Sequence, residues 1–144
     1  GNNIRENSYQ EWESMRKQSI SMVFQDLRLF PHLTAQQNLQ LIPELNSSTP
    51  SIEEMTTQLG VDNCLGQSVS TLSHGQRQRI AIIRALRKPF RLLLLDEPFS
   101  HLDEENQKHV SRLIQEVTEA NDAGLILSSL GSSPGLSFDQ QISL

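Results

Sequence analysis

The chain has 144 residues, of which 36% are hydrophobic and 20% are charged, a composition that supports one domain with a buried core and excludes a disordered chain. Its 12 basic and 17 acidic residues leave a net charge of −5, which argues against a nucleic-acid-binding protein because such proteins usually carry a basic face. The single cysteine, Cys64, excludes an internal disulfide, and no apolar run approaches the roughly 20 residues of a membrane span, so we expect a cytoplasmic protein that reaches a membrane only through a partner.

A short helix and a strand are expected first. Ser8 and Glu11 have the spacing of a capping box, in which each side chain accepts a hydrogen bond from the other residue's backbone N–H, and the helix should end near Lys17. The alternating residues from Ile20 to Phe24 then predict a strand. Gln25 closes this strand, and by itself it would be only a polar residue at a strand end.

Residues 26–71 are mostly helical by pattern. Thr34-Ala35-Gln36-Gln37 and Ser51-Ile52-Glu53-Glu54 are two further capping-box matches, so a helix should start at each. Pro43 should stop the first helix and Gly60 the second.

The next helix should begin at Ser73 to Gly75 and run to about Lys88. Free backbone N–H groups and the helix dipole at such a start favour an anion, and a small residue such as Gly75 lets a phosphate approach closely. Ser73 adds a hydroxyl donor. Without further context, Ser73 would be only an ordinary helix cap.

Four leucines, Leu92 to Leu95, lie between Pro89 and Pro98 and predict a short strand buried on both faces, as in a parallel sheet. Asp96 and Glu97 follow at its carboxyl end, where ligands bind in open α/β sheets. Adjacent side chains on a strand point to opposite sides, so one carboxylate could hold Mg²⁺ while the other faces a water molecule. An apolar strand that ends in an acidic turn is the equally consistent alternative.

The last part of the chain predicts a helix and two strands. Asp103 should cap the helix, and its core-facing stripe is expected at Val110, Leu113, Ile114 and Val117. A buried strand should begin at residues 125–127, and a short final strand is expected at residues 141–144.

Two of these stretches resemble motifs of one family. The run from Leu72 to Gln76 resembles the LSGGQ signature of the nucleotide-binding subunits of ATP-binding-cassette (ABC) transporters, with His74 in place of its first glycine. Residues 92–96 resemble the family's Walker B strand, Glu97 its catalytic glutamate, and residues 100–103 its D-loop.

The resemblance extends through nearly the whole chain in the family's order, because residues 23–25 and 29–34 resemble its Q-loop region. It implies an α/β fold, namely a partial P-loop NTPase (RecA-like) parallel sheet with an inserted helical subdomain. The whole chain would be a partial ABC nucleotide-binding domain. Residues 26–71 would form the helical subdomain, and residues 1–25 and 72–144 would form part of the α/β core.

The resemblance also implies roles in the binding and hydrolysis of ATP. Asp96 would hold Mg²⁺ through water, Glu97 would act as general base or orient the attacking water, and Gln25 would contact both Mg²⁺ and that water. Contacts to the nucleotide would come from Ser73, Gly75, Gln76 and Asp103.

The family's partners are implied as well. A second ATP-binding subunit would join head to tail, and transmembrane permease subunits would hold the protein at the cytoplasmic face of the membrane. Candidate permease contacts are Leu29, Phe30, Pro31 and Leu33, although for the two leucines the core of the subdomain is an equally good interpretation. No nucleic-acid partner is expected.

Three departures from the family limit what carries over. No Gly-rich loop ending in Gly-Lys-Ser/Thr occurs, so an incomplete domain that neither binds nor hydrolyses ATP alone is expected. Unpaired sheet edges would then favour a swapped homodimer. Leu130 stands where the family usually has a histidine, and His74 places a side chain where the family has only hydrogen.

Other functions compete with the transport ATPase. A non-catalytic ABC-like interaction or regulatory subunit fits Leu130 and the absent Gly-rich loop. A chromosome-maintenance or DNA-repair ATPase of the same superfamily is disfavoured by the short separation of Gln25 and Ser73 and by the acidic composition. A histidine-based metal site has little support, because the four histidines lack ligand spacing.

Overall fold

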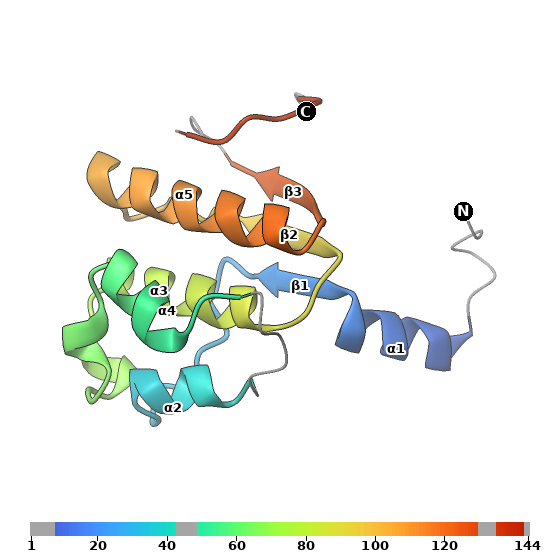
Figure 1. The fold of residues 1–144 in the computed structure, drawn as a ribbon. Helices are drawn as coiled ribbons and strands as arrows, with labels where there is room; N and C mark the ends of the chain where they lie inside the picture. Colours follow the sequence, from blue (N-terminus) through green and yellow to red (C-terminus); the bar gives the residue numbers. More distant parts are fainter. Residues whose placement is uncertain (1–7, 43–48, 130–134, 143–144) are drawn as a thin grey trace.

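The computed structural model describes residues 8–42, 49–129 and 135–142 (Figure 1). Its elements in chain order are α1 (Tyr9–Gln18), β1 (Ile20–Val23), α2 (Ala35–Gln40), α3 (Ile52–Gln58), the 3-10 turns η2 (Asp62–Cys64) and η3 (Val69–Thr71), α4 (His74–Arg87), β2 (Leu92–Asp96), α5 (Glu104–Ala120) and β3 (Gly124–Ser128). The expected α/β class is confirmed.

The three strands form one parallel sheet in the order β1-β2-β3. Val23 of β1 pairs with Leu95 of β2, and Asp96 of β2 pairs with Ser128 of β3. This register brings the carboxyl ends of all three strands to the same edge of the sheet, which is the edge where ligands bind in parallel sheets.

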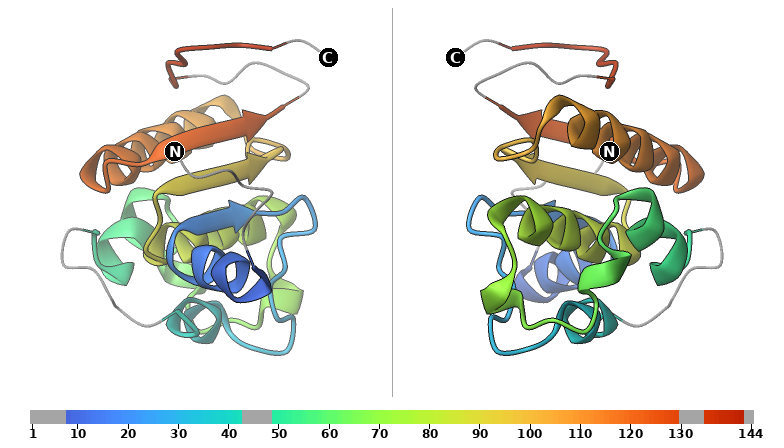
Figure 2. Two further views of the ribbon diagram at one scale, coloured as in Figure 1. Left: turned by 90° about the vertical axis from the view of Figure 1, so that its right-hand side faces the viewer. Right: turned by 90° about the vertical axis from the view of Figure 1, so that its left-hand side faces the viewer.

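The two faces of the sheet are packed differently. α4 and α5 lie across one face, as the two views of Figure 2 show, and on that face Leu93 and Leu95 are 0% and 3% exposed. On the opposite face Leu92 and Leu94 are only half-buried, and Ile126 is 59% exposed. The expectation that β2 is buried on both faces is therefore wrong, because the described residues leave this second face partly open.

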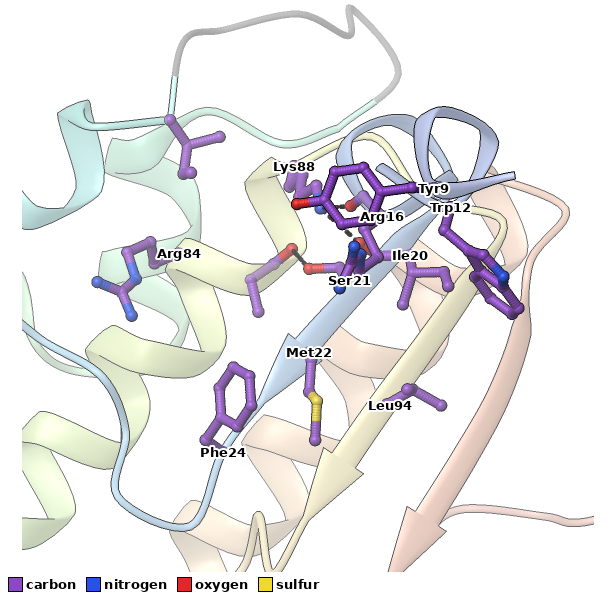
Figure 3. Close-up of a pocket in the computed structure, with 12 residues that line it drawn as sticks. Tyr9, Trp12, Arg16, Ile20, Ser21, Met22, Phe24, Arg84, Lys88 and Leu94 are labelled. Atoms are coloured by element: carbon purple, nitrogen blue, oxygen red, sulfur yellow. Dashed lines mark hydrogen bonds between the residues drawn. The ribbon is translucent and has the colours of Figure 1, made fainter. Parts of the chain in front are cut away.

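The open face has a hollow of about 860 Å³ beside α1. Trp12, Met22, Phe24 and Leu94 line it, with Arg84 from α4 at its side (Figure 3). Ile20 and Met22 of β1 and Phe24 after it line the hollow, and Ser21, although only 3% exposed, borders it as well. Val23 is buried in the core.

One hydrophobic core joins the sheet to the helices. The predicted stripe of α5 is confirmed, since its four apolar residues are each 0% exposed. α4 lies at the centre of this core, in contact with α2, α3, α5 and β1, and its fully buried side chains include Ile80, Ile82 and Ile83. The helices α2 and α3 and the sheet therefore belong to one core through their contacts with α4.

The capping boxes organise the helix starts as expected. Reciprocal side-chain to backbone hydrogen bonds are present at Ser8 and Glu11, Thr34 and Gln37, and Ser51 and Glu54. Gly60 follows α3 with a φ of 61°, which a glycine adopts readily. The stop expected at Pro43 lies outside the described residues, and the division at residues 26–71 stays a prediction.

The expectation of a final strand is wrong at its first two residues. Gln141 and Ile142 are not in a strand, and Ile142 is 80% exposed; residues 143–144 lie outside the described residues. None of the helices in the described part of the chain is long and apolar enough to cross a membrane. The swapped homodimer stays a prediction.

Replacing Leu93 by alanine should destabilise the fold, because this side chain is completely buried on the central strand. Removing its buried methyl groups should lower the free energy of unfolding by about 2–5 kcal/mol. Urea denaturation measures this change. Ile126→Ala on the open face is the control and should cost less than about 1 kcal/mol; equal losses would contradict the assigned packing.

Candidate functional site

Asp96 closes β2 and is anchored by its neighbour on β3. The Ser128 hydroxyl donates a hydrogen bond of 2.6 Å to Asp96 Oδ1, and the parallel register places the two residues side by side. A carboxylate accepts several hydrogen bonds or metal contacts through its two oxygens, so this contact leaves acceptor capacity on Asp96. Ser128 was not recognised from the sequence, although a serine at the end of the neighbouring strand is the signal that could have revealed it.

Glu97 lies in a strained turn immediately after β2. Its φ of 49° is in the left-handed region, which is unfavourable by about 1–2 kcal/mol for a residue with a Cβ. Hydrogen bonds hold this backbone on both sides: Glu97 N–H donates to Ser128 O at 3.0 Å, and Glu97 O accepts from Ser100 Oγ at 2.9 Å. The direction of the Glu97 side chain therefore follows from this turn and not from strand alternation.

Gln78 supports the same turn from α4. It is 1% exposed, and its side-chain amide donates to the carbonyls of Pro98 at 3.0 Å and Glu97 at 3.4 Å. The sequence did not single out this residue. The feature that could have revealed it in the sequence is a glutamine on a face of α4 where its neighbours are apolar.

Gln25 lies two residues beyond the end of β1 and is exposed. Because Val23 pairs with Leu95, Gln25 belongs to the same sheet edge as Asp96 and Glu97. The structure thus groups the predicted metal-binding and catalytic residues at the carboxyl ends of two neighbouring strands.

The turn at Ser73 is a complete capping box. Ser73 Oγ accepts from Gln76 N–H at 3.2 Å, and Gln76 Oε1 accepts from Ser73 N–H at 2.9 Å. The Gln76 amide also donates to Cys64 Sγ at 3.1 Å. The Gln76 side chain is therefore used within this chain, while the Ser73 hydroxyl keeps its own hydrogen for donation.

Gly75 brings this turn against the D-loop-like segment. A Cβ at Gly75 would lie 2.9 Å from the carbonyl oxygen of His101, closer than side chains approach backbone oxygens. Glycine is required there for that reason, in addition to the anion-binding role predicted for it. The contact joins the helix that begins at Ser73 to the segment that follows Glu97.

Two histidines stack at the same junction. The ring centroids of His74 and His101 are 3.9 Å apart, with 34° between the ring planes, and His74 Nδ1 is buried without a hydrogen-bond partner among the described residues. Burial lowers the pKa of His74, and the nearby His101 and Arg77 lower it further. The folded chain thus favours the neutral ring of His74, which packs on the D-loop-like segment at His101, a pairing that its sequence position did not indicate.

Asp103 caps α5 as predicted. Its carboxylate accepts from the backbone N–H of Asn106 at 2.8 Å, and this hydrogen bond is the main reason that the pKa of Asp103 is lowered. Arg79 of α4 in turn donates to Asn106 Oδ1 at 2.9 Å and to Leu59 O at 2.6 Å. Arg79, which the sequence did not single out, links α5 to the helical segment.

The donor set suits Mg²⁺. No group of three or more His, Cys, Asp or Glu side chains that could hold a metal ion occurs among the described residues. Magnesium, however, is usually held by one or two carboxylates together with substrate phosphates and waters. Asp96, anchored by Ser128, and the amide oxygen of Gln25 offer the oxygen ligands that this ion prefers.

The chain matches the family model of ABC transporters over residues 1–100, and it belongs to that family. It is 40% identical over 113 residues to the thiamine import ATP-binding protein ThiQ of Haemophilus influenzae, covering 75% of this chain and 53% of that protein. The ThiQ of Yersinia pestis is 38% identical over 115 residues, covering 76% of this chain and 49% of that protein. The chain spans about half the length of the curated relatives it matches.

Solved structures agree with this assignment. A dimeric bacterial ABC transporter cassette has a TM-score of 0.68 at 27% identity, covering 86% of this chain and 57% of its own. A post-hydrolysis dimer of an ATP-binding cassette with ADP and Pi has a TM-score of 0.69 at 26% identity, covering 88% and 58%. The resemblance to ABC ATP-binding subunits and the P-loop NTPase fold are therefore confirmed. The residue at position 130 lies outside the described residues.

Replacing Gly75 by alanine should disturb the junction, because the new methyl group would meet the His101 carbonyl at 2.9 Å. We expect the free energy of unfolding to fall by about 1–3 kcal/mol, the usual cost of forcing atoms into a packed site. Gly66→Ala is the matched control, since nothing lies within 4 Å of the position that its new methyl group would take. Equal stability of the two variants in urea would refute the close approach.

Acidification should weaken the fold through His74, whose pKa is lowered by burial in the folded state. The folded chain favours the neutral ring, so this stabilisation is complete above the ordinary histidine pKa of about 6.5 and is lost as pH falls from there through the lowered value. Between about pH 7.5 and 5.5, His74→Gln should therefore lose less unfolding free energy than the wild type, as measured by urea denaturation at each pH. Exposed His109→Gln is the control and should follow the wild type; identical pH profiles for all three proteins would exclude this role.

Proposed function

We propose that the protein is the ATP-binding and ATP-hydrolysing subunit of an ABC transporter. The observation that carries this proposal is the sheet edge where anchored Asp96, strained Glu97 and exposed Gln25 come together. The close approach of Gly75 to the His101 carbonyl joins that edge to the signature turn, which is the turn at residues 72–76. The ThiQ relatives, which are import ATP-binding proteins, support an import system.

The chemistry follows from the residues. Glu97 accepts a proton from a water molecule as the water oxygen forms a bond to the γ-phosphorus of ATP. The bond from that phosphorus to the β–γ bridging oxygen breaks, and ADP leaves with the electron pair. Gln25 orients the water, and Asp96 would hold Mg²⁺, which when bound would neutralise charge on the phosphate oxygens.

The signature turn would act on ATP bound by a second copy of the subunit in a head-to-tail dimer. The Ser73 hydroxyl and the backbone N–H groups of His74 and Gly75, the first two residues of α4, can donate to γ-phosphate oxygens, whereas the Gln76 N–H already donates to Ser73 Oγ. Gly75 keeps that surface free of a side chain. Such donors stabilise charge as it develops in the transition state. The contacts proposed for Gln76 and Asp103 would add to their capping roles.

Permease subunits would dock on the segment that follows Gln25 and hold the protein at the cytoplasmic membrane face. Phe30 is 55% exposed and Pro31 is also exposed, whereas Leu29 packs against the core. Asn38, which is 0% exposed, fixes this segment because its side-chain amide accepts from Phe30 N–H at 2.8 Å and donates to Phe30 O at 3.0 Å. Phe30 and Pro31 are the contacts we propose.

A non-catalytic ABC-like regulatory subunit is the alternative. The observation that favours it is His74, whose ring occupies the signature turn and stacks on His101. Such a subunit would bind ATP without turning it over.

The full-length protein should lose turnover when Glu97 is replaced by glutamine, because the amide cannot accept the proton of the attacking water. A loss of at least about 100-fold in kcat is expected, the scale of general-base catalysis. Exposed Glu116→Gln on α5 is the charge-matched control and should hydrolyse ATP normally. Normal turnover by the Glu97 variant would remove the role given to that residue, and a wild type that binds ATP without hydrolysis would favour the regulatory alternative.

A further inference from the structure

The turn that follows Gln25 is strained. Leu27 and Arg28 have φ values of 59° and 50°, so two consecutive residues with side chains adopt the left-handed conformation. Such residues persist in this conformation only where surrounding contacts hold them, and they cluster at functional sites. Contacts from neighbouring elements must therefore hold this turn in place.

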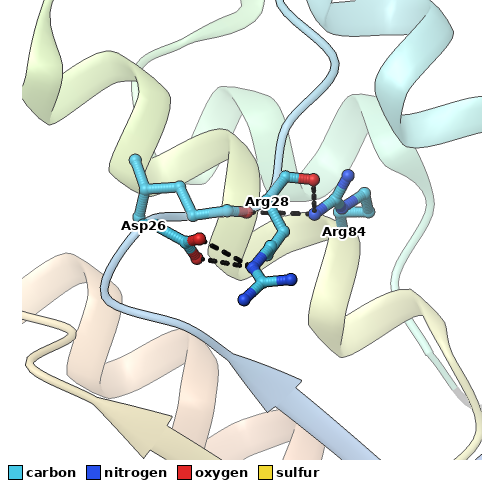
Figure 4. A network of polar contacts seen from close by, with 4 residues as sticks. Asp26, Arg28 and Arg84 are labelled. Carbon is cyan, nitrogen blue, oxygen red and sulfur yellow. Dashed lines mark hydrogen bonds and ion pairs between the residues drawn. The ribbon is translucent and has the colours of Figure 1, made fainter.

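Arg84 of α4 makes the contacts that cross from the core to this turn (Figure 4). Its Nη2 donates to the carbonyl oxygen of Leu27 at 3.0 Å and to that of Arg28 at 2.8 Å. Hydrogen bonds from a charged donor are stronger than those between neutral groups. One guanidinium therefore fixes both strained peptide units.

The other polar contacts of Asp26 and Arg28 stay within residues 24–28. Arg28 lies 2.7 Å from the Asp26 carboxylate and 4.8 Å from the centre of the Phe24 ring. Asp26 and Arg28 are both exposed, so their ion pair contributes little. Leu27 is 7% exposed and anchors the turn by packing. Polar attachment of the turn to α4 thus comes from Arg84.

The position of Arg84 on α4 links the turn after Gln25 to the start of the same helix. Arg84 lies near the end of α4, and Ser73 caps the start of the same helix. A helix of this kind is rigid over its length, because each turn is hydrogen-bonded to the next. The signature turn at one end is therefore mechanically linked to the Gln25 turn near the other.

We propose that Arg84 is a positioning residue that holds the strained turn after Gln25 and couples the placement of Gln25 to α4. This inference rests on the proposed function for its catalytic consequence, while the attachment itself can be measured without ATP. Lysine at this position would keep the charge but lose the planar fork that reaches two carbonyls.

The first test is amide hydrogen exchange of the 144-residue chain by NMR. The Leu27 and Arg28 N–H groups donate to Phe24 O at 2.9 Å and Asp26 O at 2.7 Å, so both should be protected. In Arg84→Lys their exchange should accelerate at least about tenfold, while amides in the middle of α4 change less than about threefold. Arg112→Lys, an exposed arginine on α5, is the control and should match the wild type. Unchanged exchange at the turn in Arg84→Lys would overturn the proposal.

A second variant separates positioning from a general loss of stability. Glycine at position 28 adopts a positive φ freely, so Arg28→Gly should reduce the acceleration that Arg84→Lys causes at Leu27. An acceleration that is the same in both backgrounds, with α4 amides accelerated equally, would show that Arg84 only stabilises the fold.

The catalytic consequence is measured in the full-length protein. Arg84→Lys should lower kcat about tenfold and change KM for ATP less than about twofold, because Gln25 is needed in the transition state more than in binding. Wild-type kcat in a variant whose turn exchanges faster would overturn the coupling to Gln25. The proposed function is judged separately, by turnover of the wild type against Glu97→Gln, so its failure is distinguishable from failure of this inference.

Discussion

The burial of α4 between the sheet and the helical segment is the constraint on which the rest of the structure depends. The helix is apolar on several sides, as expected for one surrounded by protein, and its polar groups reach out from it. Arg87 donates to Leu39 O at 2.7 Å, Arg79 to Leu59 O at 2.6 Å, and the Ala85 carbonyl accepts from Ser21 Oγ at 2.7 Å. Each of these bonds ties a different element to the same helix. The turn at Ser73, which begins this helix, is consequently held in position by the core around α4.

The central position of α4 also fixes two chemically different groups of this chain relative to each other. Asp96 ends β2 beside Ser128 of β3, whose hydroxyl donates to its carboxylate, and Glu97 follows in the next turn. The turn at Ser73 is fixed as the cap of α4. The close approach of Gly75 to the His101 carbonyl brings these two systems into contact. Strain at Glu97 is tolerated because the hydrogen bonds from Gln78 and Ser100 hold its carbonyl. The positions of these groups thus rest on ordinary packing and hydrogen bonding within this chain.

Features encoded by near neighbours in the sequence were predictable, and features that depend on distant segments were not. The caps at Ser8, Thr34 and Ser51, the stripe of α5 and the strand at Leu92 to Leu95 all follow from local spacing, and the structure has them. The open face of β2 was missed because burial of a strand depends on what packs over it. The left-handed backbone at Glu97 and the stacking of His74 on His101 were missed as well. Neither has a local signal. Left-handed backbone is usually marked by a glycine, and the stacking joins two residues that are far apart in the chain.

The central claim is that the signature turn of one subunit and the carboxylates of another form one ATP site, and mixing two inactive variants tests it most directly. Full-length Ser73→Arg and Glu97→Gln proteins would be assayed for ATP turnover separately and after mixing. In a mixed head-to-tail dimer, one site combines the intact Glu97 of one subunit with the intact Ser73 of the other, so mixing should restore turnover that neither variant has alone. No restoration, although the two variants form mixed dimers, would contradict the account.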